Sequence, residues 1–187
     1  MKIRIIAFIL IINLLASCAA LVVVGAAGGM IVYDRRSLPM IERDARIFYV
    51  INTSIAKSPT FDTARIVVSS FNRVVLLLGE APSDNIRQAA ERVANKTPNV
   101  RRVYNQITVG PKISIAQQSR DTWITGEIKS KMLAKKDLES GSIRVITEDG
   151  IVYLMGIVTQ DQSDLAVAIA RQIKGVKKVV KIFQYIQ

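Results

Sequence analysis

The side chain in this sequence best suited to covalent chemistry is the thiol of Cys18, in the segment "NLLASCAAL" (residues 13–21). A single cysteine cannot form an internal disulfide. Because the chain has no histidine, it also cannot form a Cys–His catalytic pair or a mixed zinc site. A free cysteine often packs as a small apolar side chain. The alternative is covalent attachment of another group to its sulfur.

The residues before Cys18 have the layout of a secretory signal peptide. Lys2 and Arg4 precede an apolar run over residues 5–12, and small residues come directly before the cysteine. The four residues "LASC" resemble the bacterial lipoprotein signal, in which the cysteine receives lipid and becomes the mature N-terminus. We therefore predict a signal peptide over residues 1–17 and lipidation of Cys18.

The same resemblance predicts where the lipidated chain goes. Ala19 follows the cysteine, and the absence of Asp at that position in Gram-negative lipoproteins favours sorting to the outer membrane, with the protein facing the periplasm. Residues 18–43 would then carry the lipid and link it to the folded part. The alternative is an uncleaved helix from about Ile5 to Val32, which is long enough to span a bilayer because a span needs roughly 20 residues.

The charge balance predicts an anionic partner. The 187 residues include 26 Lys and Arg against 15 Asp and Glu, a net charge of +11 that falls to +9 when Lys2 and Arg4 are removed. Nucleic acid, a phospholipid surface and an acidic protein all fit this charge, but nucleic acid conflicts with secretion. No P-loop and no H-E-x-x-H motif is present, so we predict neither an enzyme nor a cofactor or metal site.

An internal repeat divides the remaining chain. Residues 71–85, "FNRVVLLLGEAPSDN", align with residues 148–162, "EDGIVYLMGIVTQDQ", and the same offset pairs Asp44 with Asp121. The repeat predicts two domains, residues 44–110 and 121–187, joined by a linker over residues 111–120.

Each repeat contains the same order of hydrophobic patterns. A helical spacing, two short strands joined by a tight turn, a second helical segment and a last strand predict an α-β-β-α-β unit. Asp44 and Asp121 are predicted N-caps of the first helices. The predicted fold class is α+β: two tandem units, each a small mixed sheet with two helices on one face.

The second repeat carries a family resemblance in "DTWITGEIKSKML", "EDGIVYLMGIVT" and "VKKVVKIFQYI". It resembles the BON domain, and the whole chain resembles the dual BON-domain outer-membrane lipoproteins. The resemblance implies no enzymatic activity, binding of anionic phospholipid through the first helix of the second domain, and support of envelope integrity, at division sites in some members.

Comparing the two repeats separates predicted core positions from surface positions. Ile124, Ile128 and Met132 match apolar residues in the first repeat, whereas Trp123 matches Arg46 and therefore predicts an outward-facing side chain. Exposed apolar side chains among lysines suit a bilayer interface. The predicted phospholipid-binding residues are Trp123, Ile128, Lys129, Lys131, Leu133 and, from the first repeat, Tyr104.

Two alternatives stay open at this point. Trp123 can instead pack against the other repeat and hold the two domains together. The protein can likewise act as an interaction scaffold, whose exposed strands or helices dock a protein of an envelope assembly or of the division site.

Overall fold

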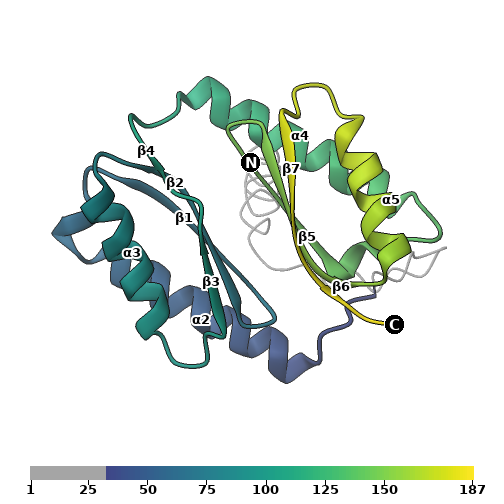
Figure 1. Cartoon of the computed structure of the whole chain (residues 1–187), viewed down its shortest axis with the longest axis horizontal. Helices are drawn as coiled ribbons and strands as arrows, with labels where there is room; N and C mark the ends of the chain where they lie inside the picture. Colours follow the sequence, from purple (N-terminus) through teal and green to yellow (C-terminus); the bar gives the residue numbers. More distant parts are fainter. Residues whose placement is uncertain (1–32) are drawn as a thin grey trace, which may run out of the picture. The chain divides into compact units, whose positions relative to one another are not determined.

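The computed structural model describes residues 33–187, which contain two domains with the same order of elements (Figure 1). The elements of the N-terminal domain are α2 (Leu38–Ala56), β1 (Arg65–Phe71), β2 (Val74–Ala81), α3 (Asp84–Lys96), β3 (Arg102–Asn105) and β4 (Thr108–Val109). Those of the C-terminal domain are α4 (Ile115–Leu133), β5 (Ile143–Glu148), β6 (Ile151–Val158), α5 (Gln160–Arg171) and β7 (Lys178–Tyr185). The predicted α-β-β-α-β order is confirmed in both domains. The last strand of the first is divided into β3 and β4, whereas β7 is continuous.

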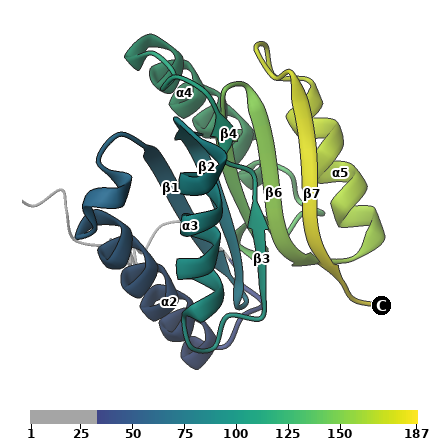
Figure 2. The same cartoon turned by 60° about the vertical axis from the view of Figure 1, so that its left-hand side comes forward.

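Both sheets are mixed, as predicted. In the N-terminal domain β1 pairs antiparallel with β2, and β3 and β4 both pair in parallel with β2. In the C-terminal domain β5 pairs antiparallel with β6, and β7 pairs in parallel with β6. The parallel pairings require a crossover, which α3 and α5 supply. Figure 2 shows α2 and α3 on the same face of their sheet.

The first helix of each domain starts earlier than the sequence predicted. Their N-caps are Ser37 and Ser114, so residues assigned to linkers form the first turns of α2 and α4. Ser114 accepts a hydrogen bond from the backbone N–H of Gln117 (3.1 Å), and Pro39 occupies the first turn of α2, where a missing N–H costs little. The prediction that Asp44 and Asp121 are N-caps is therefore wrong.

Asp44 and Asp121 instead lie buried within their helices and bind the hairpin turn of their own domain. The Asp44 carboxylate accepts the backbone N–H groups of Asn72 (2.6 Å) and Arg73 (2.8 Å). The Asp121 carboxylate accepts those of Asp149 and Gly150, both at 2.8 Å. Both turns have two residues with positive φ, as a type I′ hairpin requires, so their N–H groups need partners outside the hairpin. The carboxylate holds the helix and the hairpin together.

The paired glycines of the repeat mark a close approach between the hairpin strands. A Cβ on Gly79, whose φ is +104°, would lie 1.9 Å from the carbonyl oxygen of Arg65, and one on Gly156 would lie 2.6 Å from that of Ser142. A side chain at either position would push β1 from β2, or the turn before β5 from β6.

Each domain has an aliphatic core between its helices and its sheet. Ile47, Ile51 and Ile55 contribute to it from α2, while their counterparts on α4 are Ile124, Ile128 and Met132. These are the positions that the repeat comparison predicted to be core.

A third cluster joins the two sheets on the faces that carry no helices. This interface cluster consists of Phe71, Val74, Leu76, Leu78, Tyr153, Met155 and Ile182. Because each sheet has helices on one face and the other sheet on its second face, both faces of both sheets are covered. Val32–Gln187 accordingly form one compact unit.

The predictions for the signal peptide, for Cys18 and for the alternative spanning helix fall on residues outside those that the structure describes. Within residues 33–187, no helix combines the length and apolar character that a bilayer crossing requires.

Candidate functional site

Helix α4 carries the predicted site and presents two different faces. Ile124, Ile128 and Met132 point into the C-terminal core, spaced so that they share one side of the helix. Trp123, directly before Ile124, and Leu133, directly after Met132, are apolar and exposed.

Trp123 lies near the middle of α4, with 53% of its surface accessible. It is absent from the interface cluster that joins the two sheets. Its counterpart on α2, Arg46, is likewise exposed and pairs with Glu42 at 3.1 Å. The packing interpretation of Trp123, in which the indole is enclosed between the two domains, does not agree with this placement.

Leu133, with 38% of its surface exposed, borders a hollow of about 240 Å³. We call it the α4 hollow. Lys129, Met132 and Leu133 line it from α4, and the turn that follows contributes Ser140 and Gly141. Ile143 and Val145 of strand β5 complete its wall, so the hollow is mainly apolar with an ammonium group at its rim.

The lysines of this region are exposed, and within residues 33–187 none of them forms an ion pair. They are Lys129, Lys131, Lys135 and Lys136. The carboxylate of Glu139, in the turn after α4, is bound by Arg35 at 2.6 Å and 2.8 Å. The last two turns of α4 and the turn that follows therefore present free positive charge beside exposed apolar surface.

Two predicted site residues do not lie on this surface. Ile128 is fully buried in the C-terminal core, so it packs α4 against the sheet and does not reach the surface. Tyr104 lies on β3, half-buried against the interface cluster, and its hydroxyl accepts a hydrogen bond from Arg102 at 3.1 Å. The structure thus places Trp123, Leu133, Lys129 and Lys131 at exposed positions of α4, with Lys129 and Leu133 lining one hollow, and leaves Tyr104 at the junction of the sheets.

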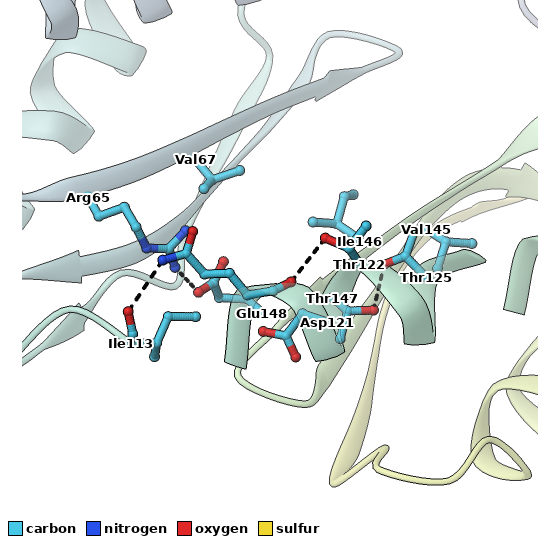
Figure 3. Close-up of a pocket in the computed structure, with 11 residues that line it drawn as sticks. Arg65, Val67, Ile113, Asp121, Thr122, Thr125, Val145, Ile146, Thr147 and Glu148 are labelled. Carbon is cyan, nitrogen blue, oxygen red and sulfur yellow. Dashed lines mark hydrogen bonds and ion pairs between the residues drawn. The ribbon is translucent and has the colours of Figure 1, made fainter. Parts of the chain in front are cut away.

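A second polar site, which the sequence reasoning missed, lies where β1 of one domain meets β5 of the other (Figure 3). Arg65 bonds Glu80 of its own sheet at 3.0 Å and reaches across to Glu148. Arg65 and Glu148 border a hollow of about 290 Å³ whose wall includes Asp121 and Thr125. Glu148 ends β5, directly before the hairpin turn that Asp121 holds.

Burial raises the pKa of Glu148 to about 7, and the carboxylates of Glu80 and Asp121 act in the same direction against the opposing charge of Arg65. The guanidinium of Arg65 therefore binds two carboxylates, those of Glu80 and Glu148, in a partly buried position. No sequence signal connects Arg65 with Glu148, because they are 83 residues apart and in different repeats. Because Arg65 bonds Glu80 in its own domain and Glu148 in the other, this site is an ionic contact between the domains. The described part of the chain holds no cluster of three metal-ligating side chains.

A further contact between domains comes from the residues just before α2. The Arg35 backbone N–H donates to Ser142 Oγ at 3.0 Å, and its guanidinium binds Glu139. The next residue, Arg36, binds Asp44 at 2.9 Å and lies 4.0 Å from the centre of the Phe71 ring. Arg35 and Arg36, in the described part of the segment predicted as a linker, therefore contact both domains.

The described residues thus form two stacked mixed sheets, each with a pair of helices on its outer face. Comparison with known proteins identifies the family. The BON domain profile matches residues 43–111 and again residues 120–187. The chain therefore belongs to the BON-domain family, among its dual-domain outer-membrane lipoproteins.

Relatives with known names support this assignment. The chain is 36% identical over 174 residues to outer membrane lipoprotein DolP of Haemophilus influenzae, covering 92% of this chain and 90% of the relative. It is 41% identical over 126 residues to a 21 kDa hemolysin of Actinobacillus pleuropneumoniae, covering 67% and 65%. Identity to osmotically-inducible protein Y of Escherichia coli is 32% over 139 residues, covering 73% and 69%. The predicted outer-membrane localisation as a lipoprotein agrees with the first of these names.

Proposed function

We propose that this lipoprotein binds anionic phospholipid through the outer face of α4, without catalysing a reaction, and thereby supports the integrity of the envelope, with division sites as a place of action. The observation that carries the proposal is the exposed Trp123 on a helix whose lysines have no carboxylate partners in residues 33–187. An indole prefers the headgroup region of a bilayer, where its ring is apolar and its N–H can meet polar groups.

The binding energy of such a surface is modest and depends on a second attachment. Each lysine close to an anionic surface contributes about 1 kcal/mol, and burial of a large apolar side chain contributes roughly 1.5–3 kcal/mol. Lipid on Cys18 would keep α4 near the bilayer, so that a weak contact gains from high effective concentration.

Replacement of Trp123 by Glu tests the proposal. We expect residues 32–187 carrying Trp123→Glu to lose binding to vesicles that contain phosphatidylglycerol, measured by co-sedimentation, with an unchanged circular dichroism spectrum. Tyr49→Glu is the matched control, because Tyr49 is an exposed aromatic residue on the equivalent helix α2. Equal loss in both variants, or unfolding of the Trp123→Glu protein, would contradict the proposed role of α4.

A scaffold for an envelope protein is the second candidate function, and the outer face of α2 favours it. Leu38 is 82% exposed and Tyr49 is 68% exposed, and Phe48 adds further apolar surface on this helix. Exposed apolar patches on soluble domains often mark protein contacts. Retention of a partner in detergent by the wild type but not by Tyr49→Glu, together with no binding to vesicles, would favour the scaffold.

A further inference from the structure

The α4 hollow differs from the rest of the α4 surface because it is concave. A helix that only lies on a bilayer needs a convex apolar ridge, and Trp123 supplies one. The hollow instead recedes between α4 and β5, down to Met132, Ile143 and Val145, all of which are buried. Such a floor offers van der Waals contact to a group that enters it from outside.

The size of the hollow limits what can occupy it. Its volume of about 240 Å³ is below the roughly 300–1,000 Å³ of pockets that enclose whole drug-sized ligands. A complete phospholipid is far larger. One short stretch of a hydrocarbon chain fits, because its cross-section is narrow and its surface matches the aliphatic floor.

The charged residues around the hollow indicate which head group the hydrocarbon chain would carry. Lys129, whose side chain is exposed, is one of the residues that line the hollow, and Lys131, Lys135 and Lys136 belong to the same end of α4 and the turn after it. Ser140, in that turn, adds a second polar residue to the lining. A neutral alkyl compound would make no ionic contact with these lysines, whereas an anionic head group attached to the alkyl chain would.

We infer that the α4 hollow is a binding site for a single anionic amphiphile: it takes one alkyl chain between Leu133 and β5 while Lys129 contacts the phosphate of the head. This inference rests on the proposed function and names the group that α4 recognises. It goes further than adsorption to a surface, because a site of this kind binds one lipid molecule at a time, in the absence of a bilayer.

A series of n-alkyl phosphates with four to ten carbons, each used below its aggregation concentration, tests the inference. Residues 32–187, which form one compact unit with their own cores, serve as the protein. The measurement follows the methyl NMR signals of Met132, Ile143 and Val145 during titration. We expect these signals to shift together, with one-to-one stoichiometry.

Chain length gives the quantitative criterion. Burial of one methylene group contributes about 0.8 kcal/mol, which is about a fourfold gain in affinity. We expect the dissociation constant to fall by about this factor for each added carbon until the hollow is full, and then to level off. A dissociation constant that is independent of chain length, or shifts spread over many other methyl groups, would overturn the inference.

Two variants distinguish the contribution of the alkyl-chain contact from that of the phosphate contact. Ser140→Leu places a larger side chain at the opening and is expected to remove the chain-length dependence. Lys129→Gln is expected to weaken binding of every member of the series by a similar factor, and Lys135→Gln, whose side chain does not line the hollow, is the control. If vesicles bind while alkyl phosphates do not, the inference fails and the proposed function stands; if neither binds, both fail.

Discussion

At the scale of single residues, the repeat acts as an internal comparison that distinguishes core from surface. It predicted that Ile124 is buried and that Trp123 is exposed, because Trp123 is matched by Arg46. It could not reveal the role of Asp44 and Asp121. An aspartate before a helical pattern looks like an N-cap, and only the three-dimensional contact with a hairpin turn, 28 residues later, identifies it as an internal acceptor.

This role predicts a strong effect of a small substitution. Asp121→Ala removes the acceptor for two backbone N–H groups, of which that of Gly150 is buried. We expect the free energy of unfolding to fall by about 3 kcal/mol. A buried donor that loses its partner costs about 1–3 kcal/mol, and the cost is near the top of this range when the lost acceptor was charged. Urea denaturation measures the change, and Asp121→Asn, which keeps one acceptor oxygen, is expected to lose less.

At the scale of elements, patterns predicted the type and order of helices and strands, but not where each of them ends. Residues 38–43 and 115–120 belong to helices, although they follow a charged, serine-containing stretch and a proline-containing stretch that resemble linkers. The division of the last N-terminal strand also had no signal, because Gln106 and Ile107 continue an ordinary strand pattern.

The sequence of strand β2 has a hydrophobic pattern that indicates how both faces of its sheet are covered. Its residues from Val74 to Ala81 are all buried, and most of them are apolar without alternation. A continuous apolar strand is typical of a sheet with both faces covered. Applied to "VVLLLG" and "IVYLMG", this rule predicts the second covering layer, which the structure supplies by packing sheet on sheet.

The two faces of β2 should respond differently to truncation. Leu77 belongs to the N-terminal core and Leu76 to the interface cluster, and both are fully buried. Either leucine replaced by Ala is expected to cost about 2–5 kcal/mol. Leu76→Ala should in addition split thermal unfolding into two steps, whereas Leu77→Ala should retain one. Differential scanning calorimetry checks this, and a split in the Leu77→Ala protein alone would contradict it.

At the scale of the whole molecule, the domains are joined by one apolar cluster and by ionic contacts around it. The sequence predicted two domains but not their contact, because Arg65 and Glu148 form an ordinary part of each strand pattern. Their pairing depends on how the sheets stack, and stacking depends on many side chains together.

The burial of Glu148 at the contact between the domains makes stability depend on pH. Since burial raises the pKa of Glu148 from 4.5 to about 7, the folded protein keeps a proton that the unfolded chain releases in this range. The contribution of Glu148 to the free energy of unfolding therefore falls as the pH rises from 4.5 to about 7. Urea denaturation at several pH values, compared between the wild type and Glu148→Gln, isolates this contribution. A wild-type curve parallel to that of Glu148→Gln would refute it.

Stacking the sheets also restricts how such a protein can gain new contacts. Within residues 33–187 both faces of each sheet are covered, so the outer faces of the helices, the loops and the strand edges form the surface. A substitution on the back of a helix, such as the one that distinguishes Trp123 from Arg46, changes what the protein touches without disturbing its interior. The two copies of the repeat can thus differ in what their helices contact while keeping the same core.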